Sequence, residues 1–84
     1  MPPKQVRRVQ TGIRVEKQLL KVLKGLAEYL DMTLGDLIEG MVLHNFDGKM
    51  PFSKPTLEKI QALKDLYELK LSAQDSHKLV EIKD

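Results

Sequence analysis

The sequence predicts a mainly α-helical fold that contains one β-strand, and two patterns in the 84 residues lead to this expectation. Side chains alternate between two faces with a period of two over residues 8–15, which is typical of a strand with one buried face. From residue 16 onward, apolar side chains recur at helical spacing in successive segments. We therefore expect a flexible arm over residues 1–5, one strand, three helices and a short final helix.

The alternation divides the predicted strand into two faces. The inner face carries Val9, Thr11, Ile13 and Val15. The outer face carries Arg8, Gln10, Gly12 and Arg14. No second strand follows in the chain, and a lone strand leaves the hydrogen-bonding groups of both its edges unpaired. The simplest partner is the same strand of a second copy, so the pattern predicts a homodimer.

Local signals set the ends of the first two predicted helices. The first helix should run from Glu16 to about Leu30, where residues 31–32 interrupt its apolar stripe. The second should run from residue 34 to about residue 46, because Thr33 and Asp36 are spaced as in a capping box and Gly48 is suited to end a helix. Its inward-facing side chains should be Leu37, Ile38, Met41, Val42 and Phe46.

Residues 49–84 are expected to form a helical extension. A third helix should start near residues 53–55, since proline is tolerated in a first turn. Its apolar face should fold back on the helical side of the dimer and cover Leu43 or its neighbours. Ser72 and Asp75 are spaced as in another capping box, which should open a short helix that carries Leu79 and Val80.

Charge is strongly segregated along the chain, although the net charge is only +2. Residues 1–24 carry seven basic side chains and one acidic side chain, whereas residues 25–48 carry five acidic side chains and no Lys or Arg. Residues 49–84 are nearly balanced, with seven basic and six acidic side chains. An anionic partner would therefore bind the N-terminal end.

Composition argues against several classes of protein. The sequence has no cysteine, which excludes disulfides, thiolate metal sites and cysteine nucleophiles. No apolar run approaches the length of a membrane span, and the N-terminus lacks the apolar stretch of a signal peptide, so we expect a cytoplasmic protein. The two histidines have no metal-binding spacing, and no phosphate-binding loop or catalytic constellation is present. We therefore expect no enzyme activity, no cofactor and no metal.

The order of elements resembles the ribbon-helix-helix family of DNA-binding proteins, which includes the Arc repressor and the plasmid copy-number repressors. The resemblance covers about residues 6–47. It is carried by the strand over residues 9–15, by the pair Leu19-Leu20 and by the turn over residues 31–35. It implies an intertwined homodimer whose two-stranded antiparallel ribbon enters the major groove of double-stranded DNA. The implied domain organisation is a DNA-binding domain over residues 1–48, followed by the extension over residues 49–84.

The resemblance also implies roles for individual residues. Base edges would be read by Gln10, Gly12 and Arg14, of which Arg14 suits guanine and Gln10 suits adenine. The DNA backbone would be contacted by Lys4, Arg7, Arg8, Thr33, Leu34 and Gly35. The dimer core would contain Val9, Ile13, Val15, Leu37, Ile38, Met41 and Val42. Gly12 departs from the family because it offers no side chain to a base, and Asp36 would compete with a phosphate at the second helix.

The function that these expectations favour is sequence-specific DNA binding by a prokaryotic transcriptional repressor. An antitoxin-like module is the main alternative, in which the extension binds a partner protein. A plasmid-partition or DNA-transfer accessory factor is a third. The apolar face over residues 57–67 should discriminate between the first two, because burial within the protein itself would make the extension structural.

Overall fold

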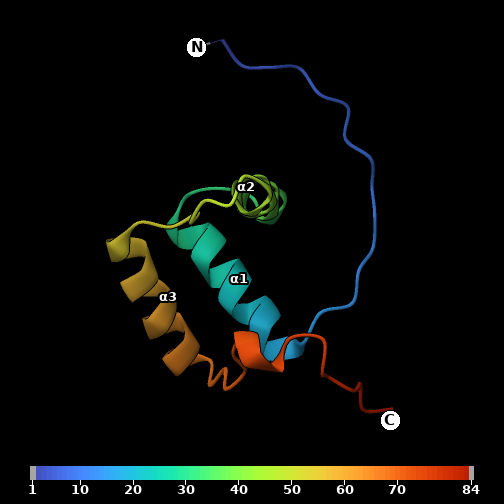
Figure 1. Ribbon diagram of the computed structural model, residues 1–84, viewed down its shortest axis with the longest axis vertical. Helices are drawn as coiled ribbons and strands as arrows, with labels where there is room; N and C mark the ends of the chain where they lie inside the picture. Colours follow the sequence, from blue (N-terminus) through green and yellow to red (C-terminus); the bar gives the residue numbers. More distant parts are fainter. Residues whose placement is uncertain (1, 84) are drawn as a thin grey trace.

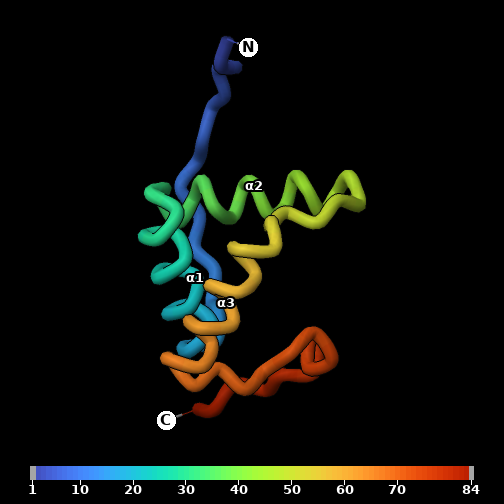
Figure 2. Tube along the Cα trace, turned by 90° about the vertical axis from the view of Figure 1, so that its left-hand side faces the viewer, coloured from blue at the N-terminus to red at the C-terminus, as the bar shows by residue number. Residues whose placement is uncertain are grey.

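The computed structural model describes residues 2–83, which form three α-helices and one short 3₁₀ helix. The elements are α1 (Lys17–Tyr29), α2 (Leu34–Phe46), α3 (Lys54–Leu66) and η1 (Ala73–Asp75). Helices α1 and α3 lie side by side, and α2 crosses the end of this pair where α1 ends and α3 begins (Figures 1 and 2). Met1 and Asp84, which belong to the predicted arm and extension, lie outside the described residues.

The predicted β-strand is wrong, because residues 2–83 contain no strand and therefore form no ribbon. Residues 2–15 instead follow a stretched path beside the helices (Figure 1), and no backbone hydrogen bond of the described chain involves them. The period-two pattern is compatible with an extended path, but a strand also needs a second extended backbone at hydrogen-bonding distance. The described chain offers none. The fold is mainly α, and the antiparallel ribbon of the expected ribbon-helix-helix dimer is not formed.

Helix α1 starts one residue later than predicted because Glu16 caps it. The Glu16 carboxylate accepts hydrogen bonds from the backbone N–H groups of Gln18 at 3.0 Å and Leu19 at 2.8 Å. These bonds satisfy donors that have no partner within the helix, and they hold the pKa of Glu16 below its ordinary value, with Gln18 contributing most. After Tyr29 the chain reverses at Asp31, whose φ of 57° lies in the left-handed region.

The predicted second helix is confirmed with both of its ends. Helix α2 spans Leu34–Phe46, and the Thr33 hydroxyl accepts a hydrogen bond from the backbone N–H of Asp36 at 3.1 Å. After the helix, Gly48 has a φ of 69°, a conformation that glycine adopts without steric cost. Thr33 and Gly48 therefore fix the length of α2.

The third helix begins as predicted but packs in a different place. Ser53 caps it by accepting a hydrogen bond from the backbone N–H of Thr56 at 3.4 Å, and Pro55 lies in its first turn. Helix α3 folds back on α1, and not over Leu43 on α2, whose side chain stays 64% exposed. Ile60 and Leu63 make this contact and are half-buried, so part of the apolar face over residues 57–67 is covered by the protein itself.

A small core lies where the three helices meet. Leu26 and Ala27 of α1 and Leu37 of α2 form a buried cluster, and Val22 is buried beside it on α1. Partly buried apolar side chains surround this cluster: Leu23, Leu30, Met41, Phe52, Ile60 and Leu63. The core is small for a protein of this length, because large apolar side chains such as Phe46 remain 82% exposed.

The predicted final helix is reduced to the single 3₁₀ turn η1. Asp75 does cap this turn, since its carboxylate accepts a hydrogen bond from the backbone N–H of Ser72 at 2.8 Å. His77 then adopts a φ of 66°, which stops a right-handed helix from continuing. Leu79 and Val80 therefore lie beyond the turn in irregular chain, which passes close to the start of α1 before it reaches the C-terminus (Figure 1).

Candidate nucleic-acid interface

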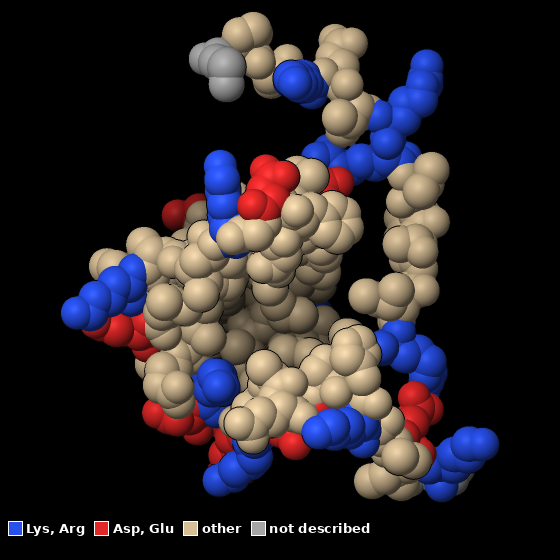
Figure 3. Space-filling view, viewed as in Figure 1, with Lys and Arg blue, Asp and Glu red and all other residues tan. Residues whose placement is uncertain are grey.

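The N-terminal segment over residues 2–15, called the arm below, concentrates exposed basic side chains. The four basic side chains of the arm, Lys4, Arg7, Arg8 and Arg14, are all exposed. Figure 3 shows Lys and Arg side chains along this stretched segment, which stands clear of the helical body over much of its length. A segment of this kind can follow a polyanion closely, because neither its side chains nor its backbone are engaged in a packed core.

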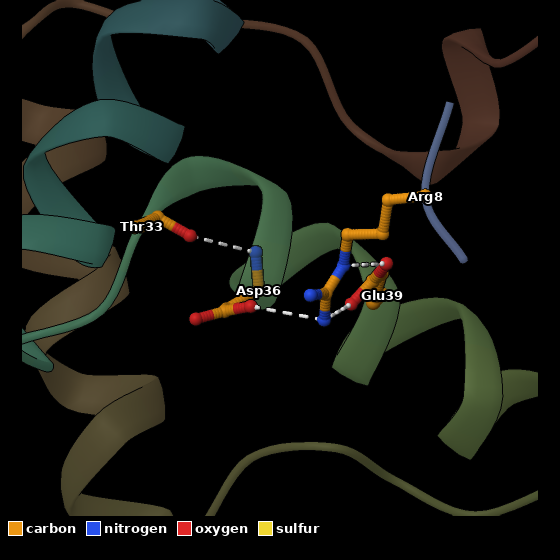
Figure 4. A network of polar contacts seen from close by, with 4 residues as sticks. All are labelled: Arg8, Thr33, Asp36 and Glu39. Atoms are coloured by element: carbon orange, nitrogen blue, oxygen red, sulfur yellow. Dashed lines mark hydrogen bonds and ion pairs between the residues drawn. The ribbon is translucent and has the colours of Figure 1, made fainter. Parts of the chain in front are cut away.

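Arg8 attaches the arm to the first turns of α2. Its Nε donates a hydrogen bond to Oε2 of Glu39 at 2.9 Å, and its Nη2 donates to Oε1 of Glu39 at 2.8 Å. The same Nη2 lies 3.6 Å from Oδ1 of Asp36 (Figure 4). The hydrogen bond with Arg8 lowers the pKa of Glu39, and the hydrogen bond with Glu39 raises that of Arg8. All three side chains are well exposed, so water and salt screen these contacts.

Arg14 makes a similar contact with the C-terminal segment. Its Nε donates a hydrogen bond to Oε1 of Glu81 at 2.9 Å, and its Nη2 donates to Oε2 at 2.6 Å. This hydrogen bond raises the pKa of Arg14. The bidentate pair joins residues that are 67 positions apart. Arg8 and Arg14 thus attach the arm at two points.

The remaining predicted base-reading and inner-face positions are also exposed. Gln10 and Gly12 face solvent, and a Cβ at Gly12 would meet nothing within 4 Å, so no close backbone approach occurs there. The apolar side chains of Val9 and Ile13 are 86% and 71% exposed. The expected division of the arm into a buried face and a reading face is therefore absent within one chain.

The predicted phosphate-binding positions lie beside the arm. Thr33, Leu34 and Gly35 form the N-terminus of α2, and Arg8 reaches the same turn through Asp36 (Figure 4). Within residues 2–83, the backbone N–H groups of Leu34 and Gly35 donate no hydrogen bond, so both donors remain available. The positive end of the helix dipole also favours an anion at this turn, whereas the carboxylate of Asp36 disfavours one.

The predicted dimer-core residues differ in burial. On α2, Leu37 is buried, and Ile38 and Met41 are half-buried. Val42 of α2 is 39% exposed, and Val15 of the arm is 41% exposed. Met41 also borders an open groove of about 440 Å³ between α1, α3 and the C-terminal segment. Figure 3 shows a hollow in the middle of the face that is turned toward the viewer. The partly exposed members of this set, Ile38, Met41 and Val42, are suited to contact with another surface.

Sequence reasoning did not identify Glu39 and Glu81 as the partners of the two arginines. No local pattern could have revealed Glu81, because its contact joins opposite ends of the chain. Three further basic side chains on α1, Lys17, Lys21 and Lys24, could have been added to the candidate interface by a helical-wheel argument. Their spacing places them on neighbouring positions of one side of α1, and all three are exposed. They follow directly after the arm and extend its positive charge.

Other kinds of site receive no support from residues 2–83. No group of three or more His, Cys, Asp or Glu side chains there could hold a metal ion. None of the described helices has the length and apolar character needed to cross a membrane. Comparisons with protein-family models, curated proteins and solved structures find no match to this chain. The resemblance to the ribbon-helix-helix family therefore rests on the sequence pattern alone.

Proposed function

We propose that this protein binds double-stranded DNA through its basic arm and acts as a transcriptional repressor in the cytoplasm of a prokaryote. The observation that carries the proposal is the exposure of Lys4, Arg7, Arg8 and Arg14 on a stretched segment that makes no backbone hydrogen bonds in the described chain. Contacts between such side chains and phosphates supply most of the affinity of DNA-binding proteins. The proposal does not involve a β-ribbon.

The arm residues divide into two roles under this proposal. Lys4 and Arg7 contact phosphates, and Arg8 contributes the guanidinium N–H groups that Glu39 does not use. These contacts orient the protein without reading sequence. Arg14 and Gln10 have the side chains that pair with the edges of guanine and adenine, and both are exposed. The free N–H groups at the N-terminus of α2 offer a further phosphate contact beside Arg8.

Self-association is part of the proposal, because the core of one chain is small. Leu43 and Phe46 of α2 are 64% and 82% exposed, and apolar area left in water costs roughly 25 cal/mol per Å². A homodimer that covers these side chains would also present two arms to a DNA site with two half-sites. Its thermal midpoint should rise with protein concentration. A well-folded monomer at micromolar concentration, shown by sedimentation, would remove this part of the proposal.

Selection of bound sites from random DNA is the most direct test. We expect recovered sites to share a motif with two related halves. Arg14→Ala should then weaken binding to the selected site by about 5- to 150-fold and relax one base position in each half. Arg7→Ala is the matched control on the same arm, and it should weaken binding to all sequences alike and reduce the dependence on salt. Failure to retain any DNA at low salt would refute the proposal.

A second function is favoured by the exposed apolar side chains near the C-terminus. Val80 and Ile82 are 91% and 84% exposed, and a partner protein that binds the extension would bury them, as in the antitoxin-like alternative. Ile60 and Leu63 of α3 are half-buried, although Leu66 is 68% exposed, so residues 76–83 are more open to such a partner than α3 is. Removal of residues 79–84 would abolish partner binding in this case, whereas the basic side chains of the arm would remain and only the contact between Arg14 and Glu81 would be lost.

A further inference from the structure

The carboxylate of Glu81 binds the guanidinium group of Arg14 in the way that a nucleic-acid phosphate would. Both Nε and Nη2 of Arg14 donate to Glu81, at 2.9 and 2.6 Å, which is the two-pronged geometry that arginine uses with carboxylates and with phosphates. The same guanidinium edge cannot hold Glu81 and a second bidentate acceptor together. Any anion that takes this edge must therefore displace Glu81.

The segment that presents Glu81 is suited to being displaced. It follows η1 as irregular chain, and its neighbours Val80 and Ile82 are almost fully exposed, so little packing holds it in place. The acceptor of Arg8 differs in this respect, because Glu39 lies on α2, which is fixed to the core by Leu37. Glu39 therefore orients the arm, whereas Glu81 is an acceptor on a loosely held tail.

We propose that the C-terminal segment around Glu81 is an autoinhibitory mask that competes with DNA for Arg14. This inference rests on the proposed DNA-binding function and adds a regulatory contact to it. In the free protein the mask neutralises the side chain best suited to read a base, while Lys4 and Arg7 make no ion pair with a described carboxylate. DNA first contacts these unpaired phosphate-binding residues. Glu81 is displaced only by a sequence whose bases form favourable contacts with Arg14. The mask thus lowers binding to unsuitable sequences.

The size of the effect follows from the exposure of the pair. The side chains of Arg14 and Glu81 are 82% and 59% exposed, so solvent screens their attraction strongly. Release of one such pair should tighten DNA binding by about 1.5- to 5-fold. The effect should shrink as salt rises, because salt screens exposed charges.

The test compares two substitutions that change the net charge equally. Glu81→Gln removes the acceptor of Arg14, and Glu68→Gln removes an exposed carboxylate that makes no ion pair in the described chain. The full-length variants are titrated against a fluorescein-labelled DNA duplex of random sequence, and binding is followed by fluorescence anisotropy. We expect Glu81→Gln to bind more tightly than Glu68→Gln, and the difference to disappear when both are combined with Arg14→Ala.

The outcomes separate the mask from the function on which it rests. Equal affinities for Glu81→Gln and Glu68→Gln would overturn the mask and leave DNA binding intact. A difference that persists in the Arg14→Ala background would also overturn it, because Glu81 would then act through another group. Absence of binding by the wild-type protein and by every variant would overturn the proposed function and the mask together.

Discussion

Gly25 lies where α1 faces α3, and substitutions there test whether the extension packs as described. A Cβ atom at position 25 would lie 3.1 Å from Cδ2 of Leu63 and 3.5 Å from Cε2 of Tyr67. The first distance is shorter than an ordinary contact of 3.4–4 Å, but the crowded atom is the end of a side chain that can shift by a few tenths of an ångström. A larger side chain would have to push α3 away from α1.

Two opposing effects decide the stability of Gly25→Ala. Replacing glycine by alanine inside a helix gains about 1 kcal/mol, and overpacking a core contact costs about 1–3 kcal/mol when a whole methylene has no room. Since one methyl group here needs only a small shift of Leu63, the two effects should nearly cancel, to within about 0.5 kcal/mol. Gly25→Leu should destabilise the protein by about 1–3 kcal/mol, because its additional carbons meet Leu63 and Tyr67.

Gly40 on α2 provides the matched control. A Cβ there would meet nothing within 4 Å, so Gly40→Ala should gain the full helix-propensity term of about 1 kcal/mol. Thermal unfolding followed by circular dichroism at one fixed protein concentration would measure these changes as midpoint shifts of roughly 4–8 °C per kcal/mol. A Gly25→Leu variant as stable as Gly40→Leu would refute the packing of α3 against α1.

Three further predictions concern the core and the helix ends. Leu37→Ala should destabilise the protein by about 2–5 kcal/mol in denaturant unfolding, whereas Leu66→Ala, at an exposed position of α3, should change the stability by less than about 0.5 kcal/mol. Thr33→Ala should lower the free energy of unfolding by about 1 kcal/mol because α2 loses its side-chain cap. Amide hydrogen exchange in the first turn of α2 that is as slow in this variant as in the wild-type protein would contradict this. The pKa of Glu16 is lowered mainly by the backbone N–H of Gln18, so its cap stabilises α1 above the ordinary glutamate pKa of about 4.3 and is lost as pH falls through the lowered value. Glu16→Gln should remove this part of the acid dependence of unfolding.

The helices could be predicted from the sequence because their signals are local. Thr33 and Gly48 set the ends of α2 through contacts within three or four residues. The apolar spacing predicts the buried face of α2 only in part, because Leu37 is buried whereas Phe46, which is expected to face inward, is 82% exposed. The strand could not be predicted in the same way. Alternation at Val9 and Ile13 specifies an extended backbone with two faces, but pairing depends on whether another extended segment lies alongside.

The candidate interface shows the same division between local and distant information. The basic character of the arm is visible in the sequence, and its exposure follows from the absence of a packing partner. The position of Arg14 next to Glu81 depends on the path of the chain after η1, where His77 adopts a left-handed conformation. Such a conformation has no signature in the capping pattern of Ser72 and Asp75, which predicts a longer helix.

The opposite charges of the arm and of α2 restrict how DNA can approach under the proposed function. Residues 25–48 contain five acidic side chains, and Asp36 and Glu39 lie directly beside the arm at Arg8. Phosphates beside Asp36 and Glu39 would be repelled by both carboxylates, so a duplex must first contact the arm on the side that faces away from α2. It can reach the free N–H groups at the N-terminus of α2 only after the arm has been drawn away. Because the described arm makes no backbone hydrogen bonds and its ion pairs are exposed, moving it away costs little. The arm is therefore the first contact of the DNA, and α2 determines the direction from which the DNA comes.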